Sequence, residues 1–404
     1  MIINEYLQRR YRVAIDLTPL ISTGENGGVN VFSHFLLESL LKLAPHWDII
    51  LLTSSNNHGY LTETYQKRVK TYCLKPPIRY ANRIVTYSVK LWHFVRQVMG
   101  WNRILDQLKV DLLLCPYTNP AFQESGIPTI TIVHDLQHLA MPQAFSWQEW
   151  LYRQLFFYQL THRSTHIVCI SEFTRQSMSQ AFPNSKPKLQ VIHHGNYRAK
   201  GVPQITEIQK ALSKYGLEQN KYFFYPANNW PHKNHRTLLK AFSQYHQHSQ
   251  NPIDLVLTGA WLQPSCLSSE EEKIYRSHPQ IHVLGYVDAQ TLESLWQGCF
   301  CLLFPSRYEG FGMPLVEAMY YHKPILCSQA ASLPEVAGDA ALYFHPDDVD
   351  DLVQKLLAIQ TDTELVHELI AKGQQRLRLF SPTVTAQKYI QLICTTLAAL
   401  GDDV

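Results

Sequence analysis

The chain has 404 residues, of which 46% are hydrophobic and 17% charged, and this indicates a globular protein with room for two domains. Its net charge of +3 at pH 7 is too small to indicate a nucleic-acid partner, so none is expected. A cytoplasmic protein is indicated by scattered cysteines without Cys-x-x-Cys, a charged N-terminus without an apolar core, and no apolar run of bilayer length.

Short apolar runs alternate with helical patterns in two series, as expected of parallel sheets covered by helices. In the first series, strands are predicted at residues 11–16, 48–52, 111–115, 129–134, 166–170 and 189–193. Residues 195–220 are polar, contain Pro203, and are predicted to connect two domains. In the second series, strands are predicted at residues 222–225, 254–258, 282–284, 299–304 and 324–327.

A glycine-rich turn, Gly24-Glu25-Asn26-Gly27-Gly28, follows the first predicted strand and precedes a helical pattern over residues 31–43. Backbone N–H groups at such a turn can hold a phosphate, which makes Gly27 and Gly28 candidate ligand contacts. A simple connection between a strand and a helix explains the same pattern equally well.

Residues 67–103 are basic and rich in aromatic side chains. An amphipathic helix of this kind can lie on anionic lipid headgroups, which allows a peripheral contact with a membrane. The alternative is a helix that buries its aromatic side chains in its own domain and leaves its cations in water.

His134 and Asp135 stand at the end of the predicted strand 129–134. A histidine at a strand end can reach a ligand and form a hydrogen bond near the reacting carbon, whereas an isolated histidine is otherwise a buried residue with satisfied partners. Asp135 is expected to shape the turn. His134 and His138 would form a metal pair only in a helix, and the preceding strand argues against that.

Lys233 lies in the sequence Pro226-Ala227-Asn228-Asn229-Trp230-Pro231-His232-Lys233-Asn234-His235, just after the strand that opens the second series. A lysine in a loop between a strand and a helix offers a point charge to a phosphate. Taken alone, Lys233 would equally be an exposed surface lysine.

Two carboxylates, Glu309 and Glu317, flank the glycine-rich turn Gly310-Phe311-Gly312 between a predicted strand and a predicted helix. The carboxyl end of a parallel strand is where open α/β sheets bind ligands, and a carboxylate accepts hydrogen bonds from two hydroxyls at once. One glutamate is therefore suited to a hexose and the other to a ribose, which indicates a sugar nucleotide. Alternatively, Glu309 caps the helix and Glu317 is a solvated or salt-bridged helix residue.

The segment from Pro305 to Ala341, with Leu333-Pro334-Glu335-Val336-Ala337-Gly338-Asp339-Ala340-Ala341 at its end, resembles the donor-site signature of family-4 retaining glycosyltransferases. The resemblance implies that Glu309 contacts the transferred sugar and Glu317 the nucleotide ribose. It also implies that Gly310, Phe311 and Gly312 supply backbone donors.

The resemblance extends to the other motifs. Gly27 and Gly28 are similar to the family's N-terminal glycine loop, although Asn30 stands where relatives have glycine. Lys233 matches the cation at the donor diphosphate, with Asn228 at the usual arginine position and His232 where some members have a basic residue. His134 matches the family's His-Asp turn.

The family fold is GT-B, an α/β architecture in which two Rossmann-like domains face each other across a cleft. The resemblance implies an acceptor-binding domain of residues 1–200 plus 382–404, with the last helix returning to it, and a donor-binding domain of residues 201–381. The expected reaction moves a hexose, with retention, from a nucleoside-diphosphate sugar to a hydroxyl of a glycan or lipid-linked acceptor. The run Trp230-Pro231-His232-Lys233-Asn234 resembles members that use GDP-mannose or related donors in surface-polysaccharide assembly.

No cofactor or metal is expected. Asp348-Val349-Asp350 matches the metal-binding Asp-x-Asp of another glycosyltransferase fold, but it opens a helix predicted at residues 349–359, where aspartates favour the helix dipole. Two other functions remain open on this fold. One is a sugar-nucleotide epimerase or phosphorylase, and the other is a nucleotide-binding protein without catalysis.

Overall fold

The computed structural model describes residues 7–20, 27–74, 103–118, 122–197, 205–260 and 267–401. The chain divides into two compact units. The first contains residues 1–136, 145–197 and 382–404, and the second contains residues 137–144 and 198–381. Each unit holds one parallel sheet, so the predicted α/β class with two Rossmann-like sheets is confirmed.

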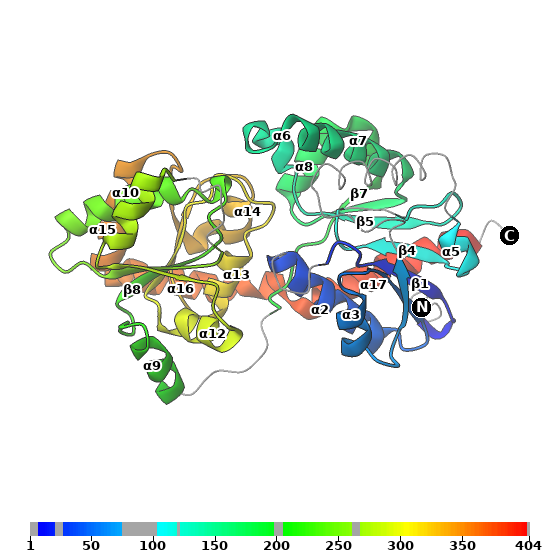
Figure 1. Cartoon of the computed structure of the whole chain (residues 1–404), viewed down its shortest axis with the longest axis horizontal. Coiled ribbons are helices and arrows are strands. Elements are labelled where there is room, and N and C mark those ends of the chain that lie inside the picture. The colour runs from blue at the N-terminus through cyan, green and yellow to red at the C-terminus, as the bar shows by residue number, and fades with distance from the viewer. Residues whose placement is uncertain are drawn as a thin grey trace. The chain divides into compact units, whose positions relative to one another are not determined.

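The first unit is built on seven parallel strands in the order β3-β2-β1-β4-β5-β6-β7. Every residue of β4 and β5 is buried, as expected for a parallel sheet that helices cover on both faces (Figure 1). The strands are β1 Arg12–Asp16, β2 Asp48–Ser54, β3 Lys70–Leu74, β4 Leu112–Cys115, β5 Thr129–Val133, β6 His166–Cys169 and β7 Leu189–Val191. The helices are α2 Gly27–Leu43, α3 His58–Thr64, α5 Ile104–Gln107, α7 Trp147–Arg163, α8 Glu172–Ala181, the 3₁₀ turn η2 Pro183–Lys188, and α17 Pro382–Gly401.

The second unit repeats this topology with six parallel strands in the order β10-β9-β8-β11-β12-β13. The strands are β8 Tyr222–Pro226, β9 Asp254–Thr258, β10 Ile281–Gly285, β11 Cys301–Phe304, β12 Ile325–Ser328 and β13 Ala341–Phe344. The helices are α6 Gln137–Ala140, α9 Ile205–Ser213, α10 His235–His248, α11 Ser269–Ser277, α12 Ala289–Gly298, α13 Met313–Tyr320, α14 Leu333–Ala337, α15 Val349–Thr361 and α16 Thr363–Leu377. The 3₁₀ turns are η1 Pro142–Ala144, η3 Pro231–Lys233, η4 Gly338–Ala340 and η5 Arg378–Phe380.

The sequence prediction missed two strands, β3 and β13. Each is the outermost strand of its sheet and pairs with a single neighbour. The prediction also treated residues 195–220 as a connection, whereas α9 occupies part of this stretch, with Ile208 and Leu212 buried. Finally, β11 begins at Cys301 rather than at Cys299, because Cys299 ends α12.

The last helix, α17, belongs to the first unit and packs against α2. Its first turn is fixed where Thr385 Oγ1 donates to the carbonyl of His193 at 3.1 Å. Gly195 lies so close to this helix that a Cβ atom would stand 2.6 Å from the Cα of Pro382. A glycine is therefore needed where the chain leaves β7 and passes the start of α17.

Two sequence predictions fall partly outside the described residues. These are the turn at Gly24-Glu25-Asn26 and residues 75–102 of the basic, aromatic segment. Among the residues that the structure describes, none of the helices combines the length and the hydropathy needed to cross a bilayer.

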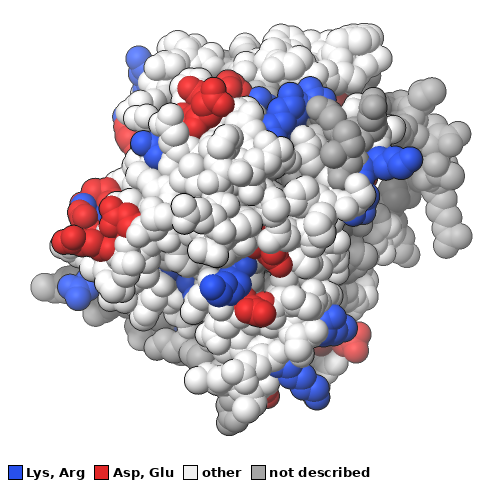
Figure 2. All heavy atoms as spheres, turned by 90° about the vertical axis from the view of Figure 1, so that its left-hand side faces the viewer, with Lys and Arg blue, Asp and Glu red and all other residues white. Residues whose placement is uncertain are grey.

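Charged side chains are dispersed on the face shown in Figure 2. Basic and acidic residues stand there in small groups, many of them beside a group of the opposite sign, and most of the visible described atoms are uncharged.

Candidate active site

Lys233 and Glu309 form an ion pair at the carboxyl edge of the second sheet. Lys233 ends η3, which follows β8, and Glu309 lies in the loop after the neighbouring strand β11. Lys233 Nζ donates to Glu309 Oε1 at 2.7 Å. The two side chains are only 18% and 13% exposed. The fold thus joins a cation and a carboxylate that the sequence separates by 76 positions.

The protein environment keeps Glu309 ionised. Burial alone would raise the pKa of this carboxyl group, but the positive charge of Lys233 opposes burial. Smaller contributions from His232 and from hydrogen bonds donated by Lys233 and Ser306 act in the same direction as Lys233, and the resulting pKa lies below the usual value. Near neutral pH, Glu309 is therefore an anion that can accept hydrogen bonds from sugar hydroxyls.

The turn after Glu309 is held in one conformation by close packing. Gly312 begins α13 with φ +94°, and a Cβ atom there would stand 2.7 Å from a methyl group of Leu333. The Phe311 ring is buried edge-to-face against Phe380, with ring centroids 5.7 Å apart. Ser332 Oγ donates to the Glu309 carbonyl at 2.9 Å. Packing and a hydrogen bond within the second unit therefore hold the turn from Glu309 to Gly312.

Glu317 lies about one helical turn inside α13 and is half-buried. Glu317 belongs to helix α13, which begins after Gly312, whereas Glu309 lies in the loop before this helix. The two carboxylates of the motif are thus held by different backbone segments, a loop and a helix, which fits two separate roles.

The two polar residues predicted to accompany Lys233, Asn228 and His232, each accept a hydrogen bond from a backbone N–H group. Asn228 Oδ1 accepts a hydrogen bond from the backbone N–H of Ala260 at 2.7 Å, which ties the loop after β8 to the loop after β9. The carbonyl of His232 accepts from the backbone N–H of Arg307 at 2.8 Å. Asn228 therefore ties the β8 loop to the β9 loop, and His232 ties the loop of Lys233 to the loop of Glu309.

Three residues that the sequence prediction passed over hold the same loops together. Tyr225 OH donates to the Lys233 carbonyl at 2.8 Å and lies 3.2 Å from Ser306 Oγ. Asn234 Nδ2 donates to the carbonyls of Pro305 at 3.0 Å and Pro346 at 2.6 Å. An asparagine directly after the lysine was visible in the sequence, but its bonding partners lie 71 and 112 positions away.

In the first unit, His134 directly follows β5 and its ring is engaged by neighbours. Nε2 lies 2.7 Å from the carbonyl of Pro116, so this nitrogen carries the proton. Burial lowers the pKa of His134, although Pro116 and Asp135 partly oppose this, and the ring is neutral near pH 7. Nδ1 then has a lone pair and can accept a hydrogen bond from a hydroxyl.

A second histidine, His194, stacks against His134 with ring centroids 5.8 Å apart. Burial lowers the pKa of His194 well below its usual value, and His134 lowers it further. Its Nδ1 lies 3.0 Å from Tyr197 OH. The sequence prediction missed this residue, because nothing in the sequence indicated that the loop after β7 would reach His134.

The two glycines at the start of α2, the Asp-x-Asp sequence and His138 lie apart in the sequence from the Lys233–Glu309 pair. Gly27 and Gly28 are exposed at the start of α2, where Gly27 has φ +51°. Asp348 caps α15, since its side chain accepts from the backbone N–H of Asp351, and this accounts for an aspartate at that position. His138 is buried in α6.

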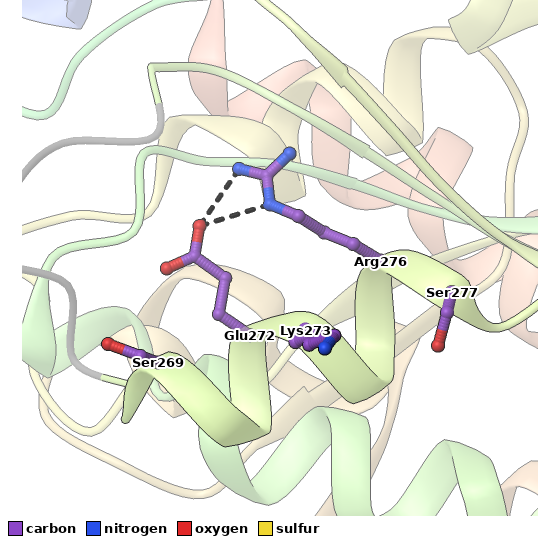
Figure 3. Close-up of a pocket in the computed structure, with 5 residues that line it drawn as sticks. All are labelled: Ser269, Glu272, Lys273, Arg276 and Ser277. Carbon is purple, nitrogen blue, oxygen red and sulfur yellow. Dashed lines mark hydrogen bonds and ion pairs between the residues drawn. The ribbon is translucent and has the colours of Figure 1, made fainter.

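A surface hollow lies along α11 and is distinct from these residues (Figure 3). Five side chains of this one helix line it, and Glu272 accepts two hydrogen bonds from Arg276 at 3.0 Å. All five belong to one helix, and the one carboxylate among them, Glu272, is paired with Arg276.

Solved glycosyltransferases share this fold. HepE from Anabaena, solved in complex with UDP and glucose, superposes with a TM-score of 0.71 over 95% of this chain and 100% of its own, at 14% identity. WaaG, described as a glycosyltransferase involved in lipopolysaccharide biosynthesis, superposes with a TM-score of 0.68 over 94% of this chain and 99% of its own, at 13% identity. Such low identities bear on the fold alone, which is that of the GT-B glycosyltransferases.

The family follows from the sequence. The profile "Glycosyltransferase Family 4" matches residues 26–196, and "Glycosyl transferases group 1" matches residues 207–376. Together these matches cover most of the chain, and the chain belongs to the family-4 glycosyltransferases.

Two bacterial relatives act on O-antigen chains according to their names. The O-antigen chain mannosyltransferase B of Escherichia coli is 28% identical over 258 residues, which are 62% of this chain and 66% of that protein. The O-antigen chain mannosyltransferase RfbU of Salmonella typhimurium is 25% identical over 220 residues, 54% of this chain and 57% of its own. The match thus spans somewhat more than half of each relative's length.

Proposed function

We propose that the protein is a retaining glycosyltransferase that moves a hexose, specifically mannose, from a nucleoside-diphosphate sugar to an acceptor hydroxyl during polysaccharide or glycolipid assembly. The observation that carries this proposal is the pairing of Lys233 with Glu309 at the carboxyl edge of the second sheet, with Glu317 on the adjoining helix. The names of the mannosyltransferase relatives support the choice of sugar.

In the proposed reaction, the bond between the anomeric carbon and the diphosphate oxygen breaks while the acceptor oxygen attacks from the same face. The proton of the acceptor hydroxyl passes to the departing diphosphate. Lys233 neutralises the leaving diphosphate, and Glu309 accepts hydrogen bonds from the hexose and stabilises positive charge at the anomeric carbon. Glu317 binds the ribose. No covalent glycosyl-enzyme and no metal ion are required, because the lysine and backbone N–H groups supply the charge stabilisation.

The alternative functions predict different activities. An epimerase or phosphorylase would convert the donor without an acceptor, and a binding protein would hold nucleotide without turnover. Carboxylates of shifted pKa beside a buried cation cluster at catalytic sites, so the Lys233–Glu309 pair supports catalysis over binding alone.

The first test is a thermal-shift titration without added metal, using UDP, GDP, ADP and their hexose conjugates. We expect GDP and GDP-mannose to raise the melting temperature of the wild type by several degrees. A ligand present at 100 times its Kd adds about 2.7 kcal/mol of stability. Glu317→Ala is expected to lose most of the GDP shift, because the ribose contact is lost.

The matched control is Glu364→Ala, which removes an exposed glutamate from helix α16 of the same unit, outside the donor-site signature, and is expected to keep the melting-temperature shift. A shift with another nucleotide would replace the donor assignment. No shift with any nucleotide, with or without magnesium, would overturn the proposed donor site.

We further propose that the protein acts in the cytoplasm on a lipid-linked acceptor. We also propose that helix α7 contacts an anionic membrane. Five of its apolar side chains are exposed, with Trp147 and Tyr158 at 70% and 61%. The others are Trp150, Leu151 and Leu155. Arg153, Arg163 and Lys186 on α7 and the adjoining η2 are cationic and exposed, while Glu149 is engaged in capping α7. Aromatic side chains with neighbouring cations suit the headgroup region of a bilayer.

This proposal predicts sedimentation with vesicles that contain phosphatidylglycerol. Replacing Trp147, Leu151 and Tyr158 together by alanine is expected to weaken binding at least tenfold, because each buried large side chain contributes about 1.5–3 kcal/mol. The control replaces Tyr286 and Leu379, which are 74% and 63% exposed in the second unit. Equal binding by both variants, or no binding by the wild type, would refute contact through α7.

A further inference from the structure

Tyr225 closes a ring of contacts around the Lys233–Glu309 pair. Its hydroxyl donates to the carbonyl of Lys233 at 2.8 Å and lies 3.2 Å from Ser306 Oγ. Ser306 in turn donates to the Glu309 carboxylate, which accepts from Lys233 Nζ at 2.7 Å. The Tyr225 side chain is fully buried, so its hydroxyl reaches no partner in solvent. The Tyr225 hydroxyl therefore bonds the backbone of the cation and contacts the serine that supports the carboxylate.

Asn234 also ties the loop of Lys233 to the loop of Glu309. It is 1% exposed and adopts the left-handed conformation, with φ +60° and ψ +36°, at the junction of η3 and α10. Its side chain does not cap α10. Instead Nδ2 bridges the carbonyls of Pro305, at the start of the Glu309 loop, and Pro346, at the start of the turn into α15.

The residue type at position 234 meets two requirements at once. Glycine would adopt φ +60° more readily than asparagine, so the backbone alone does not demand an amide side chain. The two hydrogen bonds do demand it, because a single NH₂ group supplies both donors. Asn234 therefore fixes the separation of the β8 and β11 loops in addition to shaping the turn.

We propose that Asn234 and Tyr225 are positioning residues that hold Lys233 and Glu309 at the spacing needed to engage the diphosphate and the hexose at the same time. This inference rests on the proposed glycosyl transfer. Without the two anchors, each charged residue persists, but the distance between them is no longer fixed. Binding of a nucleoside diphosphate uses Lys233 and tolerates this change, whereas transfer requires both groups in register. A displacement of about 1 Å at such a site costs on the order of 10²-fold in rate.

The test compares Asn234→Gly and Tyr225→Phe with the wild type. Asn234→Gly keeps the left-handed backbone and removes both side-chain hydrogen bonds, and Tyr225→Phe removes one hydroxyl without changing the ring. We expect kcat for transfer to fall by about 10- to 100-fold in each variant. The Kd for the nucleoside diphosphate alone is expected to change less than about threefold.

Tyr245→Phe provides a matched control for a structural effect. Tyr245 is also a fully buried tyrosine of the second unit. Its hydroxyl donates to Gln360 at 2.8 Å and accepts from the backbone N–H of Ile253 at 3.1 Å. Its loss should lower the melting temperature about as much as Tyr225→Phe and leave kcat unchanged.

The outcomes separate the two proposals. Normal kcat in folded Tyr225→Phe and Asn234→Gly, or equal losses in Tyr225→Phe and Tyr245→Phe, would overturn the positioning role while transfer stands. If Asn234→Gly does not fold, the comparison of Tyr225→Phe with Tyr245→Phe decides alone. Absence of transfer by the wild type with every donor would overturn the proposed function and, with it, this inference.

Discussion

Replacing Glu309 by glutamine is expected to lower kcat by roughly 10²- to 10³-fold, while binding of the nucleoside diphosphate weakens only slightly. The size follows from the loss of one preorganised electrostatic contact at a reacting centre. Glutamine keeps the shape but not the charge that Lys233 maintains on Glu309. Steady-state rates with a labelled nucleotide sugar, together with calorimetry of the diphosphate, measure the two effects separately.

The control for Glu309→Gln is Asp347→Asn. Asp347 also accepts a hydrogen bond from a basic residue, Arg307, which lies in the loop of Glu309, at 2.6 Å. The Asp347 side chain, however, is 58% exposed. Exposed ion pairs contribute little, so this variant should keep wild-type kcat. Similar small effects in both variants would remove Glu309 from the catalytic residues.

Lys233→Met is expected to weaken binding of the nucleoside diphosphate by roughly 10- to 100-fold. A hydrogen bond to a charged group contributes about 1.5–3 kcal/mol, and methionine keeps most of the apolar length of lysine without the charge. The corresponding nucleoside, which lacks the diphosphate, should bind the variant and the wild type equally. If the nucleoside weakened as much as the diphosphate, the lysine would be a structural residue and not a phosphate contact.

The same substitution should also reduce folding stability, because it leaves Glu309 buried without its cation. In the wild type the pKa of Glu309 is lowered, so the pair stabilises the fold above the ordinary carboxyl pKa and loses this contribution as the pH falls through the folded value. In Lys233→Met the unpaired charge on the buried Glu309 carboxylate destabilises the fold, and protonation of Glu309 removes this destabilisation. The stability difference from wild type should therefore shrink on acidification, and Lys233→Met combined with Glu309→Gln should be more stable than Lys233→Met alone.

The errors in the predicted fold have separate causes. Both missed strands, β3 and β13, lie at sheet edges. In β3, Lys70 and Thr71 interrupt the apolar run, whereas β13 is apolar throughout and its signal was overlooked. The helix α9 did carry a readable signal, because Ile205, Ile208 and Leu212 recur at helical spacing. Its position inside a polar stretch with a proline concealed it.

The central strands of both sheets and the family followed from the sequence, because buried strands leave apolar runs and the donor-site motif spans one strand, one turn and one helix. Such features depend on neighbours along the chain. The sequence alone did not reveal that Lys233 bonds Glu309, that Asn234 and Tyr225 brace this pair, or that His194 stacks on His134. These contacts join loops after different parallel strands, and only the order of the strands in the sheet brings those loops together.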